Sequence, residues 1–120
     1  MPKLPIFAAA LVTFGLLTAS DVRAEDSEQV YQFYCAQCHG ATGKGDGPNV
    51  TKDMPVTPRN FTNGAEMSKL TDDDMRNVIK DGGPAVSKSP IMPPWSQTIT
   101  DAETEGLVAY LRVMCNCKGK

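Results

Sequence analysis

The sequence predicts a small all-α domain with three main helices joined by long loops rich in glycine and proline. Apolar residues recur at helical spacing in three stretches, residues 26–38, 71–81 and 100–115. Glycines and prolines interrupt the chain between them, over residues 40–70 and again over residues 85–98. No stretch alternates polar and apolar residues convincingly, as a half-buried strand would.

The first 24 residues have the composition of a secretory signal peptide. Lys3 gives a short positive end, residues 4–17 are almost entirely apolar, and Val22-Arg23-Ala24 offers a small-x-small cleavage site. The apolar run is short for a membrane span, although an uncleaved N-terminal anchor is the alternative. We expect cleavage after Ala24 and an exported, periplasmic domain over residues 25–120.

The charge of the predicted mature chain excludes some classes of partner. Residues 25–120 contain 10 basic and 13 acidic side chains, without a basic run. Such a mildly acidic protein is a poor match for nucleic acid or for an anionic membrane surface. We expect neither partner, and no membrane span after the signal is removed.

The segment Cys35-Ala36-Gln37-Cys38-His39 carries the strongest chemical signal. Two thiols at i and i+3 lie on one side of a helical turn, and a histidine follows directly. This pattern predicts one covalently bound haem c, with Cys35 and Cys38 forming thioethers and His39 as the proximal iron ligand. The macrocycle would give the long loops a surface to pack on. Apolar side chains that the first loop could supply are Val50, Met54, Val56 and Phe61.

A second axial ligand must come from another residue type, because His39 is the only histidine in the chain. A methionine thioether is the common choice. We predict Met92 as the distal ligand, because prolines on both sides stiffen its segment and Trp95 can shield the iron–sulfur bond. Met54 is the alternative and is expected to line the pocket edge. The remaining methionines of the mature chain are Met67, Met75 and Met114.

The first helix is predicted over residues 26–38. Val30, Phe33 and Tyr34 have the spacing of a buried stripe. Tyr31 lies with the two cysteines on a neighbouring face, which we expect to turn toward the haem.

The other two helices begin with capping-box patterns. Thr71 precedes Asp74 by three residues, and Thr100 precedes Glu103 in the same way. The acidic run around Asp74 is therefore simply a helix start, where the dipole favours negative charge. The predicted buried positions of these helices are Met75, Val78, Ile79, Leu107, Val108, Leu111 and Met114, with Tyr110 at one edge.

Four motifs of the chain form a recognisable combination, namely Cys35-Ala36-Gln37-Cys38-His39-Gly40, Gly43-Lys44-Gly45-Asp46-Gly47-Pro48, Met92-Pro93-Pro94-Trp95 and Tyr110-Leu111-Arg112. Together they resemble the bacterial class I c-type cytochromes, which are small, single-haem and His/Met-ligated. The resemblance implies the small cytochrome c fold, with crossing first and last helices, and an electron carrier rather than an enzyme. It also implies that the second nitrogen of His39 bonds the backbone carbonyl of Gly47 or Pro48.

The C-terminal Cys115-Asn116-Cys117 is not part of this family pattern. An exported pair is usually oxidised, which favours a local disulfide, although its small ring would be easily reduced. Intermolecular bonding and thiol attachment to a partner or lipid are alternatives. A zinc site would also need Cys35 and Cys38. No function follows from the sequence alone.

These features predict a periplasmic single-electron carrier that passes electrons between respiratory or dehydrogenase partners. An electron-transfer subunit of a larger periplasmic oxidoreductase is the first alternative. A haem peroxidase or ligand-binding protein has less support, because a second histidine and a distal acid–base pair are missing from the sequence. A haem-free zinc or thiol redox module is the third hypothesis.

Overall fold

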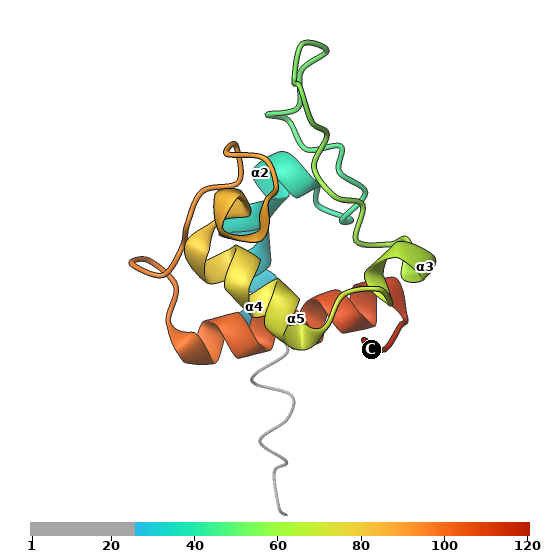
Figure 1. Ribbon diagram of the computed structural model, residues 1–120, viewed down its shortest axis with the longest axis vertical. Helices are drawn as coiled ribbons and strands as arrows, with labels where there is room; N and C mark the ends of the chain where they lie inside the picture. The colour runs from blue at the N-terminus through green and yellow to red at the C-terminus, as the bar shows by residue number, and fades with distance from the viewer. Residues whose placement is uncertain (1–25) are drawn as a thin grey trace, which may run out of the picture.

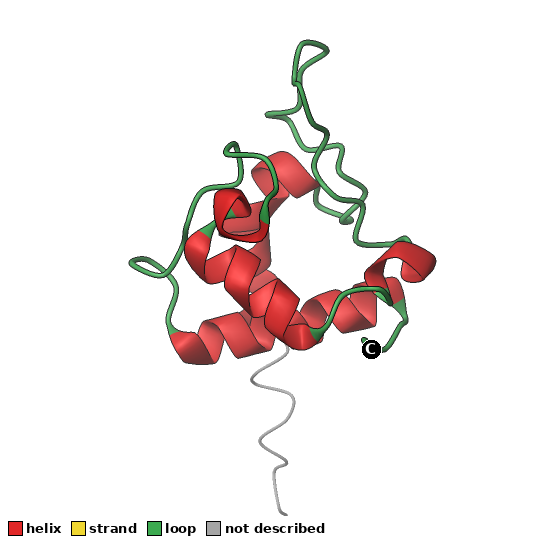
Figure 2. Cartoon of the chain, viewed as in Figure 1, coloured by secondary structure: helices red, strands yellow, loops and turns green. Residues whose placement is uncertain are grey.

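The structure of the protein is a computed structural model that describes residues 26–120 (Figure 1). The predicted signal peptide and its cleavage after Ala24 lie outside these residues. Every regular element of the described chain is helical, and none is a strand (Figure 2). The prediction of an all-α domain is confirmed.

The first helical segment is continuous from residue 26 to residue 39, but it is not a uniform α-helix. Residues 26–30 are α-helical, η1 (Tyr31–Cys35) is a π-helix, and α2 (Ala36–His39) returns to α geometry. A π turn holds an extra residue, so it shifts which side chains share a face.

This shift corrects the predicted buried stripe. Tyr31 is completely buried, whereas Phe33 is 74% exposed and Val30 and Tyr34 are half-buried. The prediction for Phe33 was wrong because it assumed α-helical periodicity through the segment. Of the face that was expected to turn toward the haem, Cys35 and Cys38 line the cavity described below, whereas Tyr31 lies in the hydrophobic core instead.

Two longer helices carry most of the core, namely α4 (Asp72–Asp81) and α5 (Asp101–Cys115). Both capping boxes are present. The Thr71 hydroxyl accepts the Asp74 N–H at 3.0 Å, and the Asp74 carboxylate accepts the Thr71 N–H at 2.8 Å. The Thr100–Glu103 pair makes the equivalent bonds. Each cap satisfies amide groups that an open helix start would leave unpaired.

Two short helices were not predicted. α3 (Gly64–Met67) is capped by Asn63, whose side-chain oxygen accepts the Glu66 N–H at 3.2 Å. The 3-10 helix η2 (Gly83–Val86) follows α4 directly. Single turns of this length are too short to give a periodic apolar pattern.

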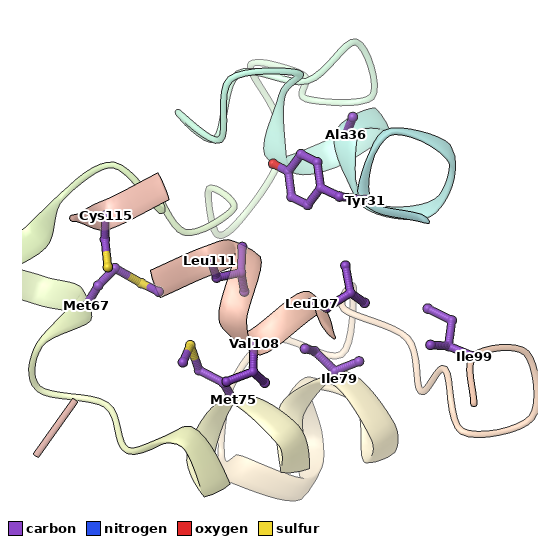
Figure 3. Close-up of a cluster of buried hydrophobic side chains, with 10 residues drawn as sticks. All are labelled: Tyr31, Ala36, Met67, Met75, Ile79, Ile99, Leu107, Val108, Leu111 and Cys115. Carbon is purple, nitrogen blue, oxygen red and sulfur yellow. The ribbon is translucent and has the colours of Figure 1, made fainter. Parts of the chain in front are cut away.

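The buried side chains form one cluster between the first helical segment, α4 and α5 (Figure 3). Val78 and Met114 are only half-buried, in contrast to the other predicted stripe residues of α4 and α5. The Lys80 ammonium also pairs with the Asp101 carboxylate at 2.7 Å and joins these two helices. The cluster consists of Tyr31, Ala36, Met67, Met75, Ile79, Ile99, Leu107, Val108, Leu111 and Cys115.

The first and last helices pack closely against each other. The rings of Tyr31 and Tyr110 lie 5.4 Å apart between centroids. Nearby, a Cβ atom added to Gly106 would collide with the Ser27 hydroxyl oxygen. Glycine in the middle of α5 therefore permits the close approach, despite its low helix propensity.

Candidate haem site

A cavity of about 630 Å³ opens between the end of the first helical segment, the loop that precedes α3, α4 and the segment around Met92. Its volume lies in the range of cofactor sites, and most of its exposed wall is apolar. Met54, Val56 and Phe61 line it as expected, whereas Val50 does not. The long loop thus forms part of the cavity wall.

The predicted attachment residues lie together on one wall. Cys35, Cys38 and His39 all line the cavity, and neither cysteine forms a disulfide. Burial, with a smaller contribution from Cys38, raises the pKa of the Cys35 thiol to about 12. The unattached Cys35 is therefore a neutral thiol at physiological pH.

The His39 imidazole is held in a defined orientation. Its Nδ1 atom lies 3.1 Å from the Arg59 carbonyl oxygen, and its ring stacks on Phe61 with centroids 4.3 Å apart. Burial lowers the pKa of His39, which favours the neutral imidazole. In the tautomer whose Nδ1–H donates to Arg59, the Nε2 lone pair is free to bind a metal.

The carbonyl partner of His39 differs from the one that the family resemblance implied. The prediction that Gly47 or Pro48 supplies this carbonyl was wrong, because the loop around these residues is held through its amide groups instead. The Gly47 N–H donates to the Cys38 carbonyl at 3.1 Å, and the Asn49 N–H donates to the Gln37 carbonyl at 2.8 Å. These bonds satisfy the last carbonyl groups of the helix, which otherwise lack partners.

Four methionines line the cavity, namely Met54, Met67, Met75 and Met92, and Met114 is not among its lining residues. Met67 and Met75 are 0% and 2% exposed and belong to the hydrophobic core. Met54 and Met92 are half-buried on loops. The cavity therefore brings both predicted candidates for the distal ligand to its walls.

The backbone around Met92 is fixed to the end of α4. The Met92 carbonyl accepts the Gly83 N–H at 2.9 Å, and the Trp95 N–H donates to the Ile79 carbonyl at 3.0 Å. Gly82 has a positive φ of 80°, and a Cβ atom there would lie 2.9 Å from the Met92 carbonyl oxygen. The glycine that ends α4 thus also allows the Met92 segment to lie directly against the helix.

Two aromatic side chains complete the wall beside this segment. Tyr34 and Trp95 both line the cavity, and their rings meet edge to face with centroids 5.4 Å apart. Trp95 therefore lies on the cavity wall, and its shielding of an iron–sulfur bond stays a prediction.

The donor set fits a covalently attached haem. Two neighbouring free thiols, an imidazole with one nitrogen committed to the backbone and methionine sulfurs share one largely apolar cavity. The zinc alternative does not fit, because Cys115 and Cys117 are bonded to each other. Within residues 26–120, no group of three or more histidine, cysteine or acidic side chains could hold a metal ion.

Comparison with known proteins agrees with this chemistry. Residues 22–111 match the family described as "Cytochrome C oxidase, cbb3-type, subunit III". The chain belongs to this family of c-type cytochromes. Members of such a family bind haem covalently, and the relationship supports electron transfer. No curated protein matches the cytochrome.

Solved structures that resemble the cytochrome include a chain of a protein complex and a c-type cytochrome. One is a chain of the reducing HAO-like protein complex Kustc0457/Kustc0458 of Kuenenia stuttgartiensis, with 31% identity and a TM-score of 0.59. The match covers 75% of the cytochrome but only 41% of that chain. The other is the KustC0563 c-type cytochrome, with 26% identity and a TM-score of 0.56. This match covers 78% of the cytochrome and 98% of the KustC0563 chain.

Proposed function

We propose that the cytochrome is an exported, periplasmic carrier of single electrons with one haem. Cys35 and Cys38 attach the haem, and His39 and Met92 are its axial ligands. The observation that carries this proposal is one largely apolar cavity with both cysteines, the oriented imidazole and the Met92 segment on its walls. The chain has one CxxCH motif and one histidine, which favours a single haem.

The haem supplies an iron centre that gains and loses one electron reversibly. The protein orients His39 through the Arg59 carbonyl and Phe61, and Tyr34 and Trp95 form an aromatic part of the wall that would shield the bound haem from water. A neutral thioether from Met92 in an apolar site would raise the reduction potential. With both axial positions occupied by protein ligands, electron transfer rather than substrate turnover is the expected activity.

A role as electron-transfer subunit of a larger periplasmic oxidoreductase is the second candidate. This role is favoured by the resemblance to one chain of an HAO-like complex. The cytochrome matches less than half of the length of that chain. In either role the partners are redox proteins. None of the helices in residues 26–120 is long and apolar enough to span a membrane.

The haem content is tested on protein expressed with its signal sequence in a host that matures c-type cytochromes. Pyridine haemochrome spectra should show one c-type haem per chain, and the intact mass should equal residues 25–120 plus one haem. A Cys35→Ala, Cys38→Ala variant should lose covalent haem. Wild-type protein without covalent haem, or with more than one, would contradict the proposal.

The distal ligand is tested by comparing Met92→Ala with Met54→Ala. Loss of the Met92 thioether should abolish the iron–sulfur charge-transfer band and lower the midpoint potential, because the ligand that favours ferrous iron is gone. Met54→Ala is the matched control, since it removes the other half-buried cavity methionine on a loop. The assignment is wrong if Met54→Ala loses the band and Met92→Ala retains it.

Purification of the native cytochrome from the periplasm of its host, without overexpression, distinguishes the two candidate roles. A free carrier should elute at the size of one chain, whereas a subunit should co-elute with a larger oxidoreductase. Recovery of the protein only from the cytoplasm would contradict the periplasmic assignment.

A further inference from the structure

The C-terminal Cys115–Cys117 disulfide is not explained by electron transfer at the haem. The two bonded cysteines are separated by a single residue at the end of α5. The entropic stabilisation from a disulfide grows with the length of the loop that it closes, so this loop provides little. A purely structural role is therefore weakly supported.

The two cysteines lie in different surroundings. Cys115 is only 6% exposed and belongs to the hydrophobic core, whereas Cys117 is half-buried and lies between the exposed Asn116 and Lys118. An external thiol can therefore approach Cys117 much more easily than Cys115.

Neighbouring polar groups also distinguish the two sulfurs. The Arg112 guanidinium places Nη1 3.7 Å from Cys117 Sγ, where its charge can stabilise a thiolate, although Arg112 also pairs with Asp72. Cys115 Sγ lies 3.4 Å from the Arg112 carbonyl oxygen. Once reduced, the Cys115 thiol can donate to that carbonyl and remain protonated.

We propose that Cys115 and Cys117 form a second redox site, which exchanges with the dithiol of a partner protein through Cys117. A partner thiolate attacks Cys117 Sγ, forming a mixed disulfide and releasing Cys115 as a thiolate that takes up a proton. The partner's second thiol then loses its proton and attacks the sulfur of the partner's first cysteine in the mixed disulfide. This attack forms the partner's disulfide and releases Cys117 as a thiolate. Two electrons pass from the partner dithiol, which becomes a disulfide, to the cytochrome's disulfide.

The same site works in the opposite direction by microscopic reversibility. Cys117 is then the attacking thiolate and Cys115 the resolving thiol, so a partner disulfide is reduced. This proposal does not depend on the identity of the haem ligands.

The reactivity is tested on folded holoprotein, with dithiothreitol as the dithiol and alkylation followed by peptide mass spectrometry as the readout. With the haem already in the ferrous state, the disulfide should be reduced at neutral pH with an unchanged haem spectrum, and an excess of oxidised glutathione should restore it. A disulfide that reacts only when the protein is unfolded would overturn the proposal.

The assignment of the exchanging sulfur is tested with Cys115→Ser and Cys117→Ser, which each leave one thiol outside the haem motif. The thiol of the Cys115→Ser variant should react with Ellman's reagent about tenfold faster or more, because Cys117 is less buried than Cys115 and lies beside a cation. Equal rates, or faster reaction of the Cys117→Ser variant, would refute it.

A second measurement avoids substitution altogether. Wild-type holoprotein treated with limiting glutathione and quenched with acid should carry glutathione on Cys117. Glutathione on Cys115 would overturn the assignment even if a serine variant fails to fold.

Discussion

The ring of Phe61 lies nearly parallel to the imidazole of His39, with centroids 4.3 Å apart and planes inclined by 19°. Phe61 is itself fixed by its N–H, which donates to the Gly43 carbonyl at 2.6 Å, and by edge contact with Tyr31. The segment that contacts the predicted proximal ligand is thus anchored to both the loop and the core.

Replacing Phe61 with leucine should lower the free energy of unfolding by about 1–2 kcal/mol, because it removes stacking and packing at a half-buried site. Urea denaturation of the holoprotein measures the change. Phe33→Leu is the matched control, since Phe33 is 74% exposed and should change stability by less than about 0.5 kcal/mol. Equal losses in the two variants would contradict the role of Phe61.

Gly47→Ala should destabilise the holoprotein by about 1–3 kcal/mol. The added Cβ atom would lie 2.6 Å from the Ala36 carbonyl oxygen, and backbone atoms of the helix cannot move aside cheaply. Thermal unfolding and the yield of haem-loaded protein measure the effect. Lys52→Ala, at an exposed position of the same loop that does not line the cavity, should leave both nearly unchanged. A neutral Gly47→Ala variant would show that the loop can relax.

Gly106→Ala should reduce stability, although alanine is intrinsically the better helix former by about 1 kcal/mol. The added methyl group would collide with the Ser27 hydroxyl at the contact between the first helical segment and α5. A double-mutant cycle with Ser27→Ala should therefore show a coupling of about 0.5–3 kcal/mol that favours the double variant. A stabilised single variant Gly106→Ala would contradict this packing.

The Glu103 cap should make part of the stability depend on pH. Hydrogen bonds from the Thr100 backbone N–H and then its hydroxyl lower the pKa of Glu103 from its ordinary value of 4.5. The cap therefore stabilises the fold fully above that ordinary value, and the contribution disappears as pH falls through the lowered pKa. The stability difference between wild type and Glu103→Gln should shrink in acid, as measured by urea denaturation across pH. A difference that is constant down to pH 2 would contradict it.

Features encoded by neighbouring residues could be predicted from the sequence. The capping boxes at Thr71 and Thr100 depend on residues three apart, and both are present. The spacing of Cys35, Cys38 and His39 likewise places them on one cavity wall because a single helical turn carries them.

Features that leave no side-chain motif or periodic apolar repeat in the sequence were missed. The Arg59 carbonyl that contacts His39 lies twenty residues further along the chain. Because every residue has a backbone carbonyl, no side-chain pattern in the sequence predicts which one His39 contacts. The exposure of Phe33 follows from a π turn whose hydrogen bonds leave no mark on composition. Short α3 is stabilised by its Asn63 cap and the burial of Met67 rather than by an amphipathic repeat.

The guanidinium of Arg112 joins parts of the chain that lie far apart. It donates to the Met67 carbonyl at 3.0 Å and the Leu70 carbonyl at 2.7 Å, and it pairs with Asp72. Any opening of the α3–α4 connection must therefore break contacts with the end of α5, so amide hydrogens of these segments should exchange with solvent together. Among the ion pairs of residues 26–120, none involves the largely exposed loop around Val56, so we expect local opening of the cavity to begin at this loop.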